Sequence, residues 1–101
     1  MRFYPCACLI AMCLMTTTFG FAATMLQTGK ELFSTPLGSN GKSCNSCHPE
    51  GKGLEHADEY PGEQLREMIN FCIRDALKGE MLSLDDPRLV QLEHYILSLK
   101  K

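Results

Sequence analysis

The spacing of apolar residues along the chain predicts helices and no strands. Between residues 62 and 78 an apolar residue returns every three or four positions, as on the buried face of a helix: Leu65, Met68, Ile69, Cys72, Ile73, Ala76 and Leu77. Gly79 follows this pattern directly and is typical of a helix end. We therefore expect a helix over residues 62–78 with Cys72 on its buried face.

A shorter apolar pattern predicts a first helix over residues 25–34. Leu26, Gly29 and Phe33 recur at helical spacing and share one face. Glycine inside a helix costs up to about 1 kcal/mol relative to alanine, so its presence needs a reason. We expect Gly29 to lie where a second backbone approaches this helix closely.

The end of the chain carries the signals of a third helix. Asp86 is a favoured N-cap residue, and Pro87 suits the first helical position because it lacks an N–H donor. The apolar residues that follow predict an inner face with Tyr95 beside it: Leu89, Leu92, Ile96 and Leu99. Three helices without a convincing strand pattern predict an all-α domain.

The first 22 residues differ from the rest of the chain and predict a secretory signal peptide. Arg2 is followed by an apolar run over residues 6–15, and small residues stand at positions −3 and −1 of a cut after Ala22. The run is short for a spanning helix, which needs about 20 apolar residues. We expect residues 1–22 to be removed and residues 23–101 to form one periplasmic domain; an uncleaved membrane anchor is the alternative.

Residues 35–61 are rich in glycine and proline and are expected to form a loop. The middle of this loop reads Cys44-Asn45-Ser46-Cys47-His48, which is the C-x-x-C-H pattern of haem c attachment. Each thiol can form a thioether with one haem vinyl group, and the histidine can be the proximal iron ligand. The sequence therefore predicts one covalently bound haem, with Cys44 and Cys47 as thioethers and His48 on the iron.

Two other chemistries share part of this motif. A C-x-x-C pair can be a thioredoxin-like redox motif, although no strand–helix–strand pattern surrounds it here. Zinc is the second alternative, because Cys44, Cys47, His48 and Cys72 would make a four-ligand set. An exported protein normally pairs its cysteines, yet three remain after residue 22, and haem attachment uses two of them. The haem interpretation is therefore favoured.

Size and charge narrow the range of partners. The chain has 101 residues, with ten Lys and Arg against twelve Asp and Glu, and a net charge of −2. A domain of this size buries a limited core, to which a covalently held cofactor would add apolar contacts. We find no basic patch for nucleic acid, and the acidity suits docking to a basic face on a redox partner. We expect redox partner proteins, no nucleic acid, and no membrane span once the signal peptide is cleaved.

The order of helix, C-x-x-C-H loop, helix and terminal helix resembles class I cytochrome c. Residues 29–33 (GKELF) are similar to the first-helix signature of that family, and residues 92–99 are similar to its last helix. The resemblance implies a small cytochrome c fold of about three helices around one covalently attached haem. It further implies that the first and last helices cross at the glycine, here against Tyr95, and that Met81 is the distal iron ligand.

A narrower resemblance covers residues 65–99, which are similar to the haem domains of thiosulfate dehydrogenases and sulfur-oxidation cytochromes. In those proteins a cysteine after an Ile-Asn stretch is the distal ligand, which implies Cys72 as the alternative to Met81. Other small c-type haem proteins resembling this one use a displaceable asparagine near a cysteine, which implies Asn70. His56 and His94 are the remaining candidates.

Three functions are possible, and the identity of the distal ligand distinguishes between them. A six-coordinate haem in a small exported domain indicates an electron carrier, which needs no catalytic acid or base, and the sequence presents no such constellation. Ligation by Cys72 indicates instead the haem subunit of an oxidoreductase acting on a sulfur compound. A weak or absent distal ligand indicates a haem protein that binds a small ligand. Single-electron transfer without enzymatic activity is the favoured function.

Overall fold

The structure is a computed structural model that describes residues 18–60 and 62–100, and all regular elements within these ranges are helical. The prediction of an all-α protein is confirmed. The elements are α1 (Thr18–Phe33), α2 (Cys44–Cys47), α3 (Gly62–Asp75) and α4 (Pro87–Leu97), with two 3-10 turns, η1 (Pro49–Gly51) and η2 (Ala57–Glu59). Within the described part of the chain, no helix has the length and apolar character needed to cross a membrane.

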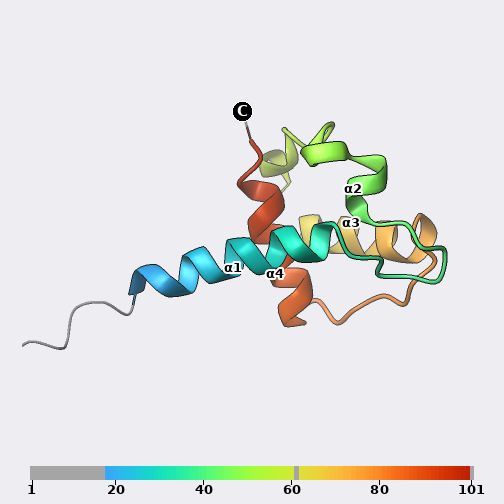
Figure 1. Ribbon diagram of the computed structural model, residues 1–101, viewed down its shortest axis with the longest axis horizontal. Coiled ribbons are helices and arrows are strands. Elements are labelled where there is room, and N and C mark those ends of the chain that lie inside the picture. Colours follow the sequence, from blue (N-terminus) through green and yellow to red (C-terminus); the bar gives the residue numbers. More distant parts are fainter. Residues whose placement is uncertain (1–17, 61, 101) are drawn as a thin grey trace, which may run out of the picture.

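Helices α1 and α4 cross in close contact (Figure 1). Gly29 lies at the crossing, where a Cβ atom would overlap the carbonyl oxygen of Gln91 and approach the Cβ of Tyr95 to 2.8 Å. One turn later, the rings of Phe33 and Tyr95 meet edge to face, with centroids 5.2 Å apart. The close backbone approach expected at Gly29 is therefore confirmed.

The boundaries of two helices differ from those expected. Helix α1 begins at Thr18 rather than at residue 25, so a cut after Ala22 would fall inside it; the preceding residues of the predicted signal peptide lie outside the described part of the chain. Helix α3 ends at Asp75 rather than at residue 78. The left-handed residue after it is Lys78, with φ of 58°, and not Gly79.

Glycine is required at position 79 because the loop that precedes the motif packs closely against the backbone there. A Cβ at Gly79 would overlap the carbonyl oxygen of Leu37, and one at Gly38 would overlap that of Leu77. The backbone N–H of Ser39 donates to the carbonyl oxygen of Lys78 at 3.1 Å. The loop leading to the C-x-x-C-H motif is thereby attached to the end of α3.

The core lies where α1, α3 and α4 meet. Its buried apolar side chains come from all three helices and the turns beside them: Phe33, Ala57, Leu65, Ile69, Ile73, Leu77, Leu89, Leu92 and Ile96. Largely buried Arg66 joins α3 to α4 through its Nε, which lies 2.8 Å from Oε2 of Glu93. Its Nη1 donates to the carbonyl oxygen of Leu84 at 2.9 Å. The inner face predicted for α4 is confirmed at Leu89, Leu92 and Ile96, which are buried. On α1, Leu26 shares the predicted apolar face with Gly29 and Phe33 but is 40% exposed.

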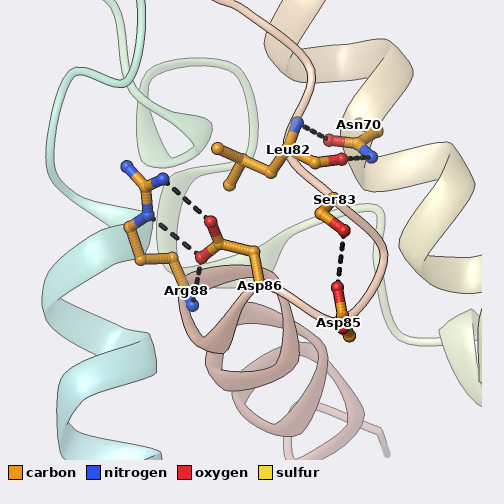
Figure 2. Close-up of polar contacts among 6 residues, drawn as sticks. All are labelled: Asn70, Leu82, Ser83, Asp85, Asp86 and Arg88. Carbon is orange, nitrogen blue, oxygen red and sulfur yellow. Dashed lines mark hydrogen bonds and ion pairs between the residues drawn. The ribbon is translucent and has the colours of Figure 1, made fainter.

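Helix α4 begins as its sequence predicts. The side chain of Asp86 accepts a hydrogen bond from the backbone N–H of Arg88 at 2.9 Å, and Pro87 occupies the first turn. The guanidinium of Arg88 also donates to both carboxylate oxygens of Asp86 (Figure 2). Together these bonds hold the pKa of Asp86 below its ordinary value. The bonds from the Arg88 guanidinium contribute most, and the bond from the backbone N–H comes second.

Gly29→Ala is expected to lower the free energy of unfolding by about 1–3 kcal/mol, because α1 and α4 must separate to admit the methyl group. The loss should occur even though alanine is the better helix former. Chemical denaturation monitored by circular dichroism measures it. Gly62→Ala is the control, since a Cβ there meets nothing within 4 Å. Equal stabilities of the two variants would contradict the close crossing.

Asp86→Ala is expected to destabilise the protein at neutral pH, with a difference from wild type that shrinks on acidification. A carboxylate whose pKa is lowered by folding stabilises the fold above its unfolded pKa, about 3.9. That contribution is lost as the pH falls through the lower folded pKa. Thermal unfolding across this range tests the sign, and Asp86→Asn, which caps without a charge, should lie between the two at neutral pH. A difference independent of pH would refute the role of the carboxylate.

Candidate functional site

The C-x-x-C-H motif forms one helical turn rather than an irregular loop. Helix α2 spans Cys44–Cys47, and the N–H of His48 donates to the carbonyl oxygen of Cys44 at 2.9 Å. The backbone N–H of Ser43 donates to Oγ of Ser46 at 3.0 Å and closes the start of the turn. Residues three and four apart share one face of a helix, so this turn gathers Cys44, Cys47 and His48 on one side.

The imidazole of His48 is oriented by the loop that follows it. Its Nδ1 lies 2.9 Å from the carbonyl oxygen of Lys52. A carbonyl oxygen only accepts hydrogen bonds, so Nδ1 carries the proton and donates it. In the neutral imidazole, Nε2 then keeps its lone pair, which is the form in which a histidine binds a metal.

The next segment of this loop is held by Asn45. Its Oδ1 accepts a hydrogen bond from the backbone N–H of Glu50 at 2.9 Å. Glu50 has a left-handed backbone with φ of 55°, a conformation that costs a non-glycine residue energy and needs such support. Asn45, which lies between the two cysteines, thereby stabilises the turn that places the Lys52 carbonyl next to His48.

Cys44, Cys47 and His48 all line a cavity of about 310 Å³. Most of its wall is apolar and comes from α1, α3, the residues just after α3, α4 and the loop after the motif: Phe33, Leu54, Leu65, Ile69, Leu77 and Ile96. A volume of this size falls in the range of small-molecule and cofactor sites. The cavity therefore joins two reactive thiols and an oriented imidazole to an apolar surface.

Helix α3 divides its apolar stripe between the core and this cavity. Ile73 is buried in the core, and Ile69 is buried where the core meets the cavity wall. Met68 and Cys72 line the cavity and are exposed, as is Ala76 just after the helix. The expectation that Cys72 lies on a buried face is therefore wrong. The apolar stripe of a helix is wide enough to contact both a core and a neighbouring cavity. Hydrophobic spacing alone does not show which of its residues face which of the two.

The three thiols lie close enough to affect one another. The pKa of Cys44 is raised to about 11. Burial of the thiol is the main cause, and the proximity of Cys72 is the second. Cys72 is partly shielded from water by the cavity wall, and this partial burial is the main cause that raises its pKa, followed by the charge of Asp75 and by Cys47. These three cysteines, which are the ones in the described part of the chain, are free. The described residues form no cluster of three or more His, Cys, Asp or Glu side chains that could hold a metal ion, so the geometry gives the zinc alternative no support.

Met81 lies outside the cavity lining. Its side chain is 44% exposed, and its Sδ lies 3.6 Å from Nη1 of Arg74. Arg74 in turn lies over the ring of Phe71, 5.2 Å from the centroid, on the solvent side of α3. The structure therefore does not bring Met81 together with Cys44, Cys47 and His48.

Asn70 is buried, and both the nitrogen and the oxygen of its amide are hydrogen-bonded within the fold. Its Nδ2 donates to the carbonyl oxygen of Leu82, and its Oδ1 accepts from the N–H of the same residue, both at 2.8 Å (Figure 2). Asn70 does not line the cavity. Its place before Cys72 thus reflects a structural role, in which it holds the segment between α3 and α4.

The two remaining histidines differ in position. His56 lines the cavity, but its side chain is 83% exposed and its Nδ1 lies 3.3 Å from Oε1 of Glu59. His94 is exposed on α4 and does not line the cavity.

Met68 is a cavity residue that the sequence did not indicate as a candidate ligand. The apolar stripe predicted a core position for it, but it lines the cavity and is 38% exposed. The available signal was its position four residues before Cys72, which places both sulfurs on one face of α3.

No protein-family model, curated protein or solved structure matches this chain.

Asn70→Ala is expected to lower the free energy of unfolding by about 1–3 kcal/mol, because it leaves the N–H and C=O of Leu82 without partners. Urea denaturation measures the loss. Gln64→Ala, at an exposed position of the same helix, is the control and should be close to wild type. Wild-type stability of the Asn70 variant would show that the amide is not needed by the fold.

Proposed function

We propose that the protein is a monohaem c-type cytochrome that transfers single electrons between redox partners. The observation that carries this proposal is the arrangement of the motif at the cavity. Cys44 and Cys47 stand on the cavity wall, and the bond between His48 and the Lys52 carbonyl leaves Nε2 free as a ligand atom. A disulfide or redox pair would not need the histidine oriented in this way.

The residues around the cavity fit the group. A haem is a flat apolar ring with reactive vinyl groups, and when bound it supplies an iron that alternates between Fe(III) and Fe(II). Cys44 and Cys47 would hold it covalently, and His48 would bind its iron. Phe33, Leu65 and the other apolar wall residues would exclude water from its faces. These roles belong to the small cytochrome c fold expected from the sequence.

Electron transfer needs access for a partner rather than catalytic groups. Cys47 lines the cavity and is exposed to solvent, so the α2 side of the cavity is open to another protein. One exposed acidic side chain, Glu59, lines this cavity, and the chain as a whole is acidic with a net charge of −2. A redox partner with a basic face is therefore the proposed partner, in the periplasm if residues 1–22 direct export.

A second function is favoured by one observation, which is that Cys72 lines the cavity and Met81 does not. Cysteine ligation on the distal side is the feature expected of the sulfur-oxidising haem domains that residues 65–99 resemble. The alternative is therefore the haem subunit of an oxidoreductase for a sulfur compound. Turnover of thiosulfate with an artificial electron acceptor would favour this alternative over a simple carrier.

Expression of the full chain with haem-attachment machinery is expected to give a polypeptide that carries one haem covalently. Denaturing gel electrophoresis with haem staining, together with mass spectrometry, checks it. Cys44→Ser and Cys47→Ser should each lose one thioether, and the double variant should lose covalent haem entirely. Cys72→Ser is the matched control and should keep both thioethers. A colourless wild-type protein under these conditions would refute the proposed function.

A further inference from the structure

Two sulfur-bearing side chains line the cavity from the same face of α3. Met68 and Cys72 are four residues apart, which is about one helical turn, and both belong to the cavity wall. The same cavity is lined by Cys44, Cys47 and His48 of α2 and the adjoining residue. A cofactor held by the motif would therefore share its cavity with two sulfur donors of α3 rather than one.

The two sulfurs can reach a common region of the cavity. The Cβ atoms of residues four apart on a helix are about 5–6 Å apart. Helical side chains lean toward the helix N-terminus, so the thiol of Cys72 leans toward the turn that contains Met68. Methionine has three rotatable bonds and adapts its position more readily than other apolar side chains. The flexibility of Met68 would thus let its sulfur take the place of the Cys72 sulfur.

Neither side chain serves the core. Ile69 and Ile73, which alternate with them along α3, are 6% and 1% exposed, whereas Met68 is 38% exposed. Cys72 is a free cysteine at an exposed position of the wall. Met81 provides a contrast, because its thioether lies against Arg74 outside the cavity.

The two donors prefer different oxidation states of iron. A thiolate is an anion and stabilises Fe(III), whereas a neutral thioether raises the reduction potential and so favours Fe(II). A cavity with both donors within reach therefore allows the ligand to follow the oxidation state.

We propose that Cys72 and Met68 are alternative iron ligands, with Cys72 bound in the oxidised protein and Met68 in the reduced protein. This inference rests on the haem function proposed above. When a one-electron donor reduces Fe(III) to Fe(II), the bond from iron to Sγ of Cys72 breaks with both electrons remaining on sulfur. The thiolate takes one proton from water, and a lone pair on Sδ of Met68 forms the new bond. Reoxidation by the electron acceptor reverses each step.

Three single variants of the haem-loaded full chain test the exchange by absorption and electron paramagnetic resonance spectroscopy. Met68→Leu should keep the oxidised spectrum and lose the six-coordinate, low-spin spectrum of the reduced form. It should also bind carbon monoxide faster than wild type when reduced. Cys72→Ser should change the oxidised spectrum and keep the reduced one. Met81→Leu is the matched control and should change neither, so a changed reduced spectrum there would overturn the proposal.

A measurement without substitution covers the case in which Met68→Leu does not fold. Proton NMR of the reduced wild-type protein, with labelled methionine methyl groups, should show one methyl strongly shifted upfield by the porphyrin ring current and assignable to Met68. Covalent haem without this signal would overturn the ligand exchange alone. Absence of covalent haem from the wild-type protein would overturn the haem function and the exchange together.

Discussion

The close approach of α1 and α4 at Gly29 is the constraint on which the rest of the fold depends. Because residue 29 has no Cβ, the α4 backbone at Gln91 lies directly against α1. The same crossing sets Phe33 against Tyr95 and places Phe33 and Ile96 on the cavity wall. A wider crossing would withdraw these two side chains and open the apolar wall to water. The packing of the terminal helices is thus also what shapes the site.

Helix α3 connects this scaffold to the motif through two sets of side chains. One set, with Ile69 and Ile73, is buried in the core, and Ile69 also reaches the cavity wall. Asn70 beside this set fixes the Leu82 segment. The other set, with Met68 and Cys72, forms part of the cavity wall. The loop before the motif is attached to the end of this helix through the Leu37–Ser39 segment. The position of the thiols of α2 relative to the sulfurs of α3 is therefore determined within one packed unit.

Local signals predicted several features correctly because the interactions behind them are local. The N-cap of Asp86 involves a residue two positions away, and the apolar spacing of α4 follows from helical geometry alone. The glycine at the end of α3 shows the limit of such reasoning. A glycine after a helix usually takes the left-handed conformation, but here Lys78 takes it and Gly79 makes room for Leu37, more than 40 positions away in sequence. Contacts between distant segments leave no periodic pattern.

The sequence by itself determined the helical class, the crossing glycine, the start of the last helix and the candidate chemistry of Cys44, Cys47 and His48. Each of these follows from residue type and short-range spacing. Only the tertiary structure decided which sulfurs accompany that motif. It placed Cys72 and Met68 at the cavity and left Met81 against Arg74 outside it. The physical reason is that burial of a helical side chain depends on which neighbouring helix packs against it. The two sides of the apolar stripe of α3 look alike in sequence, and only the packing of α4 decides which of them is covered.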